Sequence, residues 1–357
     1  MSFLKNLFTS KPKYVHVEPG GEEFEVPGGQ TILEAALAQN IPYPHDCTVG
    51  TCGSCKTLLT EGRVRALNDF GYTLSQDELA AGYILACQAL PKDEITRVKL
   101  ENPATEGVEP EDFEGRVAAT EPLTHDIVKL TVALDRPLHY IAGQYANIKV
   151  PQVGRERHYS FAQPPLKDGR DEVSFFVRKI PGGAFTEALF AGEYDCQALV
   201  VNAPQGHFHL RQGDGPMLCI AGGSGLAPVL ALLEAARKNR VQRDCVFLFG
   251  ARTQADLYCL DRIREVEQGW KGRFEFHPVL SEEPEDSGWA GKRGLVTEHV
   301  AASLPDADWS RVQGYMCGPP PMIDAGIHAM VELGTPLPQI YHDKFTDESH
   351  GAKHENA

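Results

Sequence analysis

The stretch Cys47-Thr48-Val49-Gly50-Thr51-Cys52-Gly53-Ser54-Cys55 places three cysteines on one short loop, and Cys87 follows 32 positions after Cys55. Four residues separate the first two cysteines and two separate the next pair, which is the spacing of a plant-type [2Fe–2S] cluster. Gly50 and Gly53 leave room beside the sulfides and free the backbone, so that N–H groups can point at sulfur. The sequence therefore predicts an iron–sulfur cluster held by Cys47, Cys52, Cys55 and Cys87.

A structural zinc site and a set of buried free cysteines are the alternatives to this cluster. A zinc ribbon normally pairs two C-x-x-C knuckles, and this chain has only the one from Cys52 to Cys55. The chain contains nine cysteines in all. The others are scattered, mostly within apolar runs, and we expect them to be reduced, buried thiols, as in a reducing cytoplasm: Cys196, Cys219, Cys245, Cys259 and Cys317.

Length and charge narrow the classes of protein. A chain of 357 residues should hold two or three domains. The formal net charge of −15 argues against nucleic acid and against an anionic membrane surface as partners, and it suits a redox partner with a basic patch. No apolar run reaches the length of a transmembrane segment, and the start shows no signal-peptide pattern. The amphipathic run Phe3–Phe8 could bind weakly at a membrane surface, but a poorly ordered terminus is the interpretation that we favour.

The first predicted domain covers residues 14–101. Tyr14–Val17 and Glu23–Val26 alternate as strands do, and Ile32–Gln39 has helical spacing with Thr31 as N-cap. Strands packed across one helix, with the cysteine loop at the edge, describe a β-grasp [2Fe–2S] ferredoxin domain. Residues 102–113 are acidic, contain proline and have no Lys or Arg, so they are predicted to be a linker.

The pattern of predicted strands and helices changes twice in the rest of the chain. Residues 114–212 contain short strand-like segments separated by turn residues, which predicts an antiparallel β-barrel. Residues 213–346 alternate strands with helices, beginning with the buried strand Met217–Ala221 and the helix Leu226–Lys238. That alternation predicts a parallel α/β domain.

Two motifs in the predicted barrel indicate a flavin. Arg157-His158-Tyr159-Ser160 offers a bidentate grip on phosphate, a ring for stacking and a hydroxyl for a ring nitrogen. Four residues of this kind are common, so this motif alone decides little. A second segment begins at Arg178 and runs through Gly182 and Gly183 to Thr186, where a helix starts. Glycines that open a helix can form an anion site, and together the two motifs fit FAD with its pyrophosphate.

Two motifs in the predicted α/β domain indicate a nicotinamide nucleotide. The turn Gly222-Gly223-Ser224-Gly225 joins a buried strand to a helix, which allows a pyrophosphate to approach the backbone. It is not the G-x-G-x-x-G fingerprint, and its specificity is only moderate. Arg252 ends the next strand without a second basic residue, which favours NADH over NADPH. Cys317-Gly318-Pro319 ends a later strand; Cys317 is expected to face the ligand crevice, although a buried core thiol is the alternative.

In this order, the motifs resemble the ferredoxin–flavin–NADH reductase components of bacterial multicomponent oxygenases, from about Tyr14 to Phe345. The likeness is greatest to those that serve xylene/toluene-type monooxygenases. The resemblance implies that Arg157, Tyr159, Ser160, Val177, Arg178, Gly183 and Thr186 bind FAD, and that Gly223, Ser224 and Gly225 bind NADH. It also implies that Cys317 lies beside the nicotinamide and that Asp343 and Phe345 lie at the flavin. Thr48 departs from the family, where a basic residue is common, which puts the mode of partner docking in doubt.

The resemblance further implies a function. NADH would reduce FAD, FAD would reduce the cluster, and the cluster would pass electrons to an oxygenase or hydroxylase component, here in aromatic hydrocarbon oxidation. That partner could be a membrane-embedded di-iron hydroxylase, which would place a cytoplasmic protein at the inner membrane. A soluble Rieske dioxygenase, a soluble di-iron monooxygenase or a sugar dehydrase could be served by the same layout. A non-catalytic redox sensor is the alternative from another class, but no output domain supports it.

Overall fold

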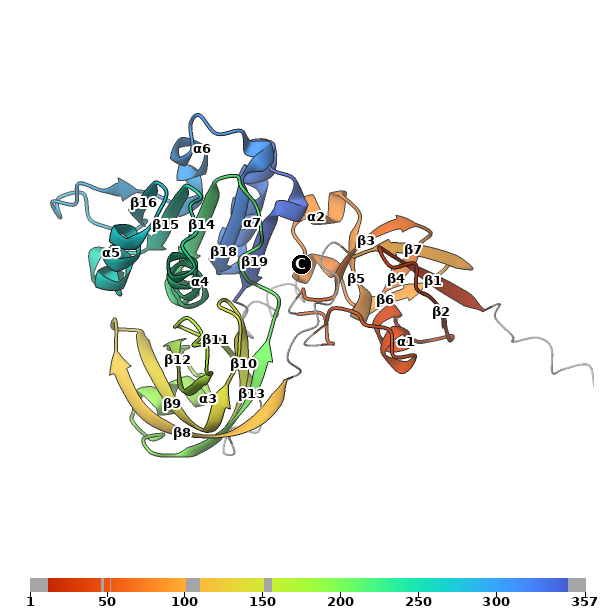
Figure 1. The fold of residues 1–357 in the computed structure, drawn as a ribbon, viewed down its shortest axis with the longest axis horizontal. Coiled ribbons are helices and arrows are strands. Elements are labelled where there is room, and N and C mark those ends of the chain that lie inside the picture. The colour runs from red at the N-terminus through yellow and green to blue at the C-terminus, as the bar shows by residue number, and fades with distance from the viewer. Residues whose placement is uncertain (1–11, 46–47, 52, 101–109, 151–155, 346–357) are drawn as a thin grey trace, which may run out of the picture. The chain divides into compact units, whose positions relative to one another are not determined.

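The computed structural model describes residues 12–45, 48–51, 53–100, 110–150 and 156–345 (Figure 1). The described residues form two compact units, one within residues 12–100 and the other within residues 110–345. The second unit contains two lobes, which we call the barrel lobe (residues 110–211) and the sheet lobe (residues 216–345). Within the described ranges, no helix is both long and apolar enough to cross a membrane.

The first unit is built on a mixed sheet with the strand order β2-β1-β7-β3-β5, in which β1 and β7 run parallel. Its strands are β1 (Lys13–Glu18), β2 (Glu23–Val26), β3 (Lys56–Glu61), β5 (Tyr83–Leu85) and β7 (Ile95–Lys99). Helix α1 (Ile32–Ala38) buries Ile32 and Leu33. As predicted, Thr31 caps this helix: its hydroxyl accepts from the Glu34 N–H at 3.2 Å, and the Glu34 carboxylate accepts from the Thr31 N–H at 2.8 Å. The predicted β-grasp fold is confirmed.

Small elements complete the first unit around the cysteine loop. They are the paired strands β4 (Val64–Ala66) and β6 (Ala89–Pro91), helix α2 (Gln76–Ala80), and the 3₁₀ turns Phe70–Tyr72 and Ala86–Gln88. Ser75 caps α2, and the buried Glu78 carboxylate closes that cap and also pairs with Lys56 at 2.6 Å. Sequence reasoning did not predict α2 or its cap.

The barrel lobe is an antiparallel sheet with the order β11-β10-β13-β8-β9-β12. A bridge between Phe161 and Phe175 and a hydrogen bond from Ala162 N to Ser174 O connect the β11 end to β12, so the sheet closes on itself. Its elements are β8 (Glu111–Pro122), β9 (Ile127–Leu138), β10 (Tyr145–Lys149), β11 (Glu156–Ser160), β12 (Arg170–Arg178), α3 (Ala184–Phe190) and β13 (Ala198–Gln205). The predicted antiparallel barrel is therefore confirmed.

The boundary between the predicted linker and the barrel lobe differs from the one that composition predicted. Strand β8 begins at Glu111 and pairs with β13 through Glu111–Ala203 and Asp112–Asn202. The range predicted as a linker, 102–113, therefore includes the first residues of the barrel sheet; its other residues, apart from Pro110, lie outside the described ranges. The sequence did not indicate a strand here because the residues on its solvated face are acidic, whereas Phe113 on the other face is buried.

The sheet lobe is a parallel sheet with the order β17-β16-β15-β14-β18-β19 (Figure 1). Its strands are β14 (Met217–Gly222), β15 (Cys245–Ala251), β16 (Phe274–Leu280), β17 (Lys292–Arg293), β18 (Gln313–Gly318) and β19 (Ile340–Lys344). Its helices are α4 (Leu226–Lys238), α5 (Leu260–Gly269), α6 (Val300–Ser303) and α7 (Pro320–Glu332). Helix α4 has the predicted bounds, whereas α5 and β19 were not predicted.

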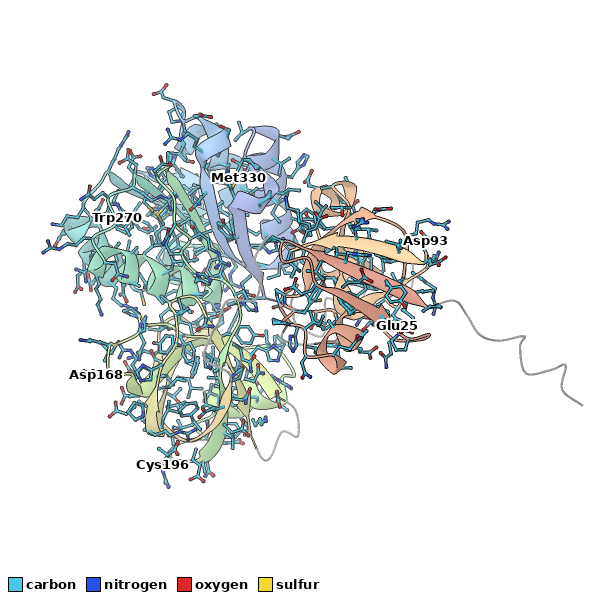
Figure 2. The ribbon with its side chains drawn as sticks, turned by 45° about the vertical axis from the view of Figure 1, so that its right-hand side comes forward. Glu25, Asp93, Asp168, Cys196, Trp270 and Met330 are labelled. Carbon is cyan, nitrogen blue, oxygen red and sulfur yellow. The ribbon has the colours of Figure 1, made fainter. Side chains whose placement is uncertain are left out.

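Two apolar layers hold this sheet. Residues of α4 and α5 pack on one face together with Trp270, and residues of α6 and α7, including Met330, pack on the other. Trp270 and Met330 are both buried, and Figure 2 labels them. The first layer also takes in Ile127, Phe176 and Phe208 of the barrel lobe. Because the two lobes share this core, residues from both can form one site.

Candidate functional site

The cysteine loop of the first unit keeps sulfur close to backbone and side-chain donors. Cys47 and Cys52 lie outside the described residues. Cys55 immediately precedes β3, and Cys87 lies in the 3₁₀ turn Ala86–Gln88. The Cys87 N–H donates to the Cys55 Sγ at 3.5 Å, and the Gln88 amide donates to the Cys87 Sγ at 3.7 Å. Donors that point at sulfur stabilise a thiolate, which is the form that binds iron, so these residues fit the predicted cluster.

The two glycines of this loop have the backbone that was expected of them. Gly50 has φ +86° and Gly53 has φ +77°, which side-chain-bearing residues rarely adopt. A Cβ on Gly50 would come within 2.7 Å of the Gln88 Cγ. Gln88 also donates to the Thr48 carbonyl at 3.4 Å, and the Thr73 hydroxyl donates to the Gly50 carbonyl at 2.5 Å. These two clamping side chains were missed because they come from other parts of the sequence.

The predicted flavin quartet lies within strand β11. Alternation along a strand places Arg157 and Tyr159 on one face and His158 and Ser160 on the other. The Tyr159 ring packs near Phe175 and Phe185, with ring centroids 6.4 and 5.9 Å apart, and burial raises the pKa of its hydroxyl above the usual value. Ser160 is buried. One face of β11 thus carries the charge and the ring that a dinucleotide needs.

The second flavin motif forms a tight turn between β12 and α3. Gly182 has φ +74° with open space around its missing Cβ. Its N–H donates to the Glu187 carboxylate at 3.3 Å, and the Gly183 N–H donates to the Ile180 carbonyl at 2.9 Å. The Thr186 hydroxyl accepts from the Ile180 N–H at 3.0 Å. These groups bond within the turn in this structure, so their assignment to a pyrophosphate stays a prediction.

Arg178 ends β12 beside this turn, whereas its neighbour Val177 is fully buried. A Cβ built on Gly223 would lie 3.8 Å from the Arg178 Nη1 and near no other described atom. The barrel lobe therefore presents a guanidinium to the glycine turn of the sheet lobe. Sequence reasoning placed Arg178 at FAD and did not bring it to this second turn.

The turn Gly222–Gly225 lies where β14 ends and α4 begins. Strand β15 lies on one side of β14 and β18 on the other, so the turn is at a topological switch point, where parallel sheets bind ligands. Gly223 has φ +55°, and a Cβ on Gly225 would overlap the Cys317 carbonyl oxygen. The open backbone at Gly223 and Ser224 and the N-terminus of α4 fit a pyrophosphate.

Cys317 lies at the same edge of the sheet. It is paired in register with Ala221 of β14 and with Asp343 of β19. Burial, and then the charge of Asp343, raise the pKa of its thiol well above the ordinary value, so the sulfur stays protonated. The Phe345 N–H donates to the Gly318 carbonyl at 2.9 Å. The structure thus brings together residues that sequence reasoning assigned to the nicotinamide and flavin from three separate segments.

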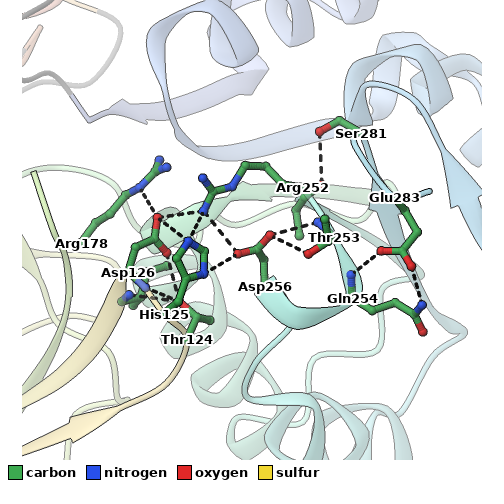
Figure 3. Close-up of polar contacts among 12 residues, drawn as sticks. Thr124, His125, Asp126, Arg178, Arg252, Thr253, Gln254, Asp256, Ser281 and Glu283 are labelled. Atoms are coloured by element: carbon green, nitrogen blue, oxygen red, sulfur yellow. Dashed lines mark hydrogen bonds and ion pairs between the residues drawn. The ribbon is translucent and has the colours of Figure 1, made fainter. Parts of the chain in front are cut away.

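A polar network joins the two lobes beside this edge (Figure 3). The Asp126 Oδ2, from the barrel lobe, lies 3.1 Å from the Arg178 Nε and 2.8 Å from the Arg252 Nη2. Asp256 contacts the same Arg252 nitrogen at 3.3 Å and His125 at 3.3 Å. Burial works to raise the pKa of Asp126, but the neighbouring cations outweigh it and the pKa is lowered.

This network was not predicted as a whole. Arg252 was expected to reach the adenosine side of the nucleotide, and its pairing with Asp126, which is 126 positions away, has no signal in the sequence. Tyr258 was also missed: its hydroxyl donates to the Gly223 carbonyl at 2.9 Å and so fixes the glycine turn.

Comparison with known proteins agrees with these sites. Residues 15–92 match the 2Fe-2S iron-sulfur cluster binding domain, residues 114–210 the oxidoreductase FAD-binding domain, and residues 219–326 the oxidoreductase NAD-binding domain. The fold and the sites therefore define a flavin- and iron–sulfur-containing oxidoreductase, with a [2Fe–2S] cluster, FAD and NADH as the cofactors that were predicted.

Individual relatives define the family more closely. The chain is 41% identical to the xylene/toluene monooxygenase electron transfer component of Pseudomonas putida over 96% of both chains. It is 35% identical to the reductase component of propane 2-monooxygenase from Rhodococcus jostii, over 93% of this chain and 91% of that protein. The crystal structure of an Amycolatopsis cytochrome P450 reductase matches with a TM-score of 0.70 at 33% identity, over 94% of this chain and 99% of that one. The chain belongs to the reductase components of multicomponent oxygenases, and it passes electrons from NADH through FAD and the cluster to an oxygenase component.

Proposed function

We propose specific roles for the residues at the sheet edge and in the cysteine loop. Gly223, Ser224 and the start of α4 hold the pyrophosphate of NADH, and Cys317 and Phe345 border the nicotinamide and flavin rings. Arg157, Tyr159 and Ser160 hold FAD, with Arg178 between the two dinucleotides. The observation that carries this proposal is the convergence of the Gly222–Gly225 turn, Cys317 and Asp343 on one edge of the parallel sheet.

When bound, FAD takes two electrons from NADH and releases them one at a time, which suits the one-electron capacity of a [2Fe–2S] cluster. The described residues serve this exchange by position. The Cys317 thiol is fully buried and remains neutral, so it adds no charge beside the nicotinamide. Tyr258 fixes the glycine turn by its hydrogen bond to Gly223, and the Arg178 guanidinium lies beside that turn. The Cys87 N–H and the Gln88 amide donate to the sulfurs of Cys55 and Cys87, which would be cluster ligands, and such bonds tune the reduction potential of a bound cluster.

The partner is an oxygenase component, and its kind is part of this proposal. The named relatives belong to a xylene/toluene monooxygenase, a propane 2-monooxygenase and a cytochrome P450 system. Since the same layout serves such different oxygenases, the layout alone does not choose among them. The greater similarity to the xylene/toluene system supports an oxygenase for aromatic hydrocarbons as the partner. More specifically, we propose that this partner is a membrane-embedded hydroxylase. The net charge of −15 favours a docking surface with basic residues.

A truncation tests the membrane-embedded partner. The amphipathic run Phe3–Phe8 lies outside the described residues. Deleting residues 1–10 should lower hydroxylation by membrane fractions that contain the hydroxylase, while NADH-dependent dye reduction stays unchanged. Undiminished turnover by the truncated protein would contradict a role of this segment at the membrane.

The nucleotide is NADH in preference to NADPH. Arg252 is the cation at the carboxyl end of β15, where the adenosine ribose is expected to lie. Two carboxylates, of Asp126 and Asp256, already pair with it. A 2′-phosphate would have to displace them and would be repelled by both.

A cluster variant tests the electron route. In Cys87→Ala, we expect ferricyanide reduction by NADH to continue, because this dye accepts electrons directly from the flavin. Reduction of cytochrome c and turnover of the oxygenase should be lost, because they need the cluster. If cytochrome c reduction survived in a variant shown to lack iron, the proposed route would be wrong.

A further inference from the structure

Asp126 occupies an unusual position for a residue of the flavin-binding lobe. It is the last residue of the turn between β8 and β9, and its carboxylate points at the sheet lobe (Figure 3). One oxygen, Oδ2, lies within ion-pair distance of both Arg178 and Arg252. The Asp126 side chain is only 17% exposed, so these pairs are shielded more than pairs on an open surface.

The distances at Arg252 show which of the two carboxylates pairs with its guanidinium more closely. The Arg252 Nη2 lies 2.8 Å from Asp126 and 3.3 Å from Asp256. The other Asp256 oxygen accepts hydrogen bonds from the Thr253 N–H and hydroxyl, both at 3.0 Å. Asp256 is therefore shared with its own turn, and Asp126 makes the shorter contact to the guanidinium. The Arg252 side chain is 38% exposed, so an entering anion could reach it if Asp126 released it.

The side chains of His125, Asp126 and Asp256 lie close together, but this group is not organised as a cation site. Both carboxylates already contact Arg252, and Asp126 contacts Arg178 as well. Two guanidinium charges balance two carboxylates, so a metal ion would meet no net negative charge here.

We propose that Asp126 is a specificity-determining residue of the reductase: by pairing with Arg252 across the two lobes, it withholds that arginine from a 2′-phosphate and so selects NADH against NADPH. The inference rests on the proposed NADH preference and explains it through a residue of the flavin-binding lobe. Asp126 acts through Arg252, so it is a positioning residue. It also holds Arg178 against the glycine turn, which favours a pyrophosphate of either nucleotide equally.

Binding of nucleotide fragments tests this role without any electron transfer. Calorimetry would give the dissociation constants of 5′-ADP and 2′,5′-ADP for the FAD-loaded wild type, D126A and D126N. We expect the ratio of the two constants to shift toward 2′,5′-ADP by about tenfold in D126A, since a charged hydrogen bond to the added phosphate becomes available. The ratio of kcat/KM for NADPH and NADH should shift in the same direction, mainly through the KM for NADPH.

Two further variants separate specificity from damage to the fold. The double variant D126A/R252A should lose the gain, because the freed arginine is gone. E234A is a matched control: Glu234 is 13% exposed, pairs with Arg262 at 2.8 Å, and Arg262 also bonds across the lobes to the Ala162 carbonyl. Removing Glu234 disturbs a similarly shielded ion pair within the sheet lobe, whose arginine bonds across the lobes, and the fragment ratio should stay at the wild-type value.

The outcomes are distinct. An unchanged ratio in D126A would overturn the inference, as would an equal shift in E234A or a gain that survives loss of Arg252. If D126A fails to retain FAD, D126N decides in its place, because it removes the charge and keeps the side-chain volume. The wild-type ratio tests the proposed NADH preference by itself, whereas the change of ratio on substitution tests Asp126.

Discussion

The two glycine-rich turns of the second unit look alike in sequence and differ in what their glycines do. Gly222–Gly225 opens α4, a helix of 13 residues whose Leu226–Leu233 segment is wholly buried. Gly182 and Gly183 open α3, a helix of only seven residues. A Cβ on Gly225 would overlap the Cys317 carbonyl, whereas a Cβ on Gly182 would meet nothing within 4 Å. Gly225 is therefore needed for close packing at the edge of the sheet, whereas Gly182 is needed for its backbone conformation.

The sharpest way to break this comparison is to add one methyl group to each turn. Gly225→Ala should lower kcat/KM for NADH by about 100-fold or more, because displaced backbone at the nucleotide site costs that much in positioning. Gly182→Ala should leave kcat/KM near the wild-type value and lower the free energy of unfolding by about 1–2 kcal/mol, the strain of a left-handed alanine. Equal losses of NADH oxidation in the two variants would contradict the distinction.

Cys317 extends the comparison to the strand that faces the first turn. Cys317→Ala should reduce kcat about tenfold with a smaller change in the dissociation constant of NAD⁺, since we propose that the residue borders the reacting ring and not the pyrophosphate. Rapid-reaction absorbance of the flavin at saturating NADH measures the step directly. If instead NAD⁺ binding weakened and kcat held, Cys317 would be a packing residue of β18.

Thr186 tests the second turn through its hydroxyl. Thr186→Val should lower the free energy of unfolding by about 1 kcal/mol, because the Ile180 N–H, in a partly buried hydrogen bond, loses its acceptor. Chemical denaturation of the FAD-loaded protein measures this. Thr186→Ser keeps the hydroxyl and should restore most of the stability. A loss of NADH turnover in Thr186→Val with full FAD and unchanged stability would show that this hydroxyl serves catalysis.

The smallest expected effect is a difference in reactivity between two thiols of the second unit, those of Cys196 and Cys317. Iodoacetamide at mildly alkaline pH should modify Cys196, which is exposed, without loss of NADH oxidation. Cys317 should remain unmodified in the native protein, because it is fully buried and its raised pKa keeps the thiolate scarce. Mass spectrometry of the labelled peptides reads both sites at once. Rapid labelling of Cys317 in folded protein would mean that the edge of β18 opens.

Local patterns explain what could be predicted from the sequence. The Thr31 cap and the bounds of α4 depend on neighbours within a few residues. The cysteine spacing is equally local, except for Cys87. These features were predicted because propensity, capping and turn chemistry act over one or two turns of chain.

Contacts between distant residues explain what could not be predicted. Asp126 meets Arg252, Tyr258 meets Gly223 and Gln88 meets Thr48 only after the strands have paired. An acidic strand start at Glu111 resembled a linker because its partner β13 lies far along the chain. The local composition around each of these residues is ordinary, so their roles appear only in the folded structure.

The central claim is that electrons pass from NADH through FAD to a [2Fe–2S] cluster held by Cys47, Cys52, Cys55 and Cys87. An anaerobic absorbance titration with NADH, followed by low-temperature EPR of the reduced sample, tests it most directly. We expect flavin bleaching followed by a rhombic spin-half signal, with NADPH far less effective than NADH. Flavin bleaching without any cluster signal would contradict it.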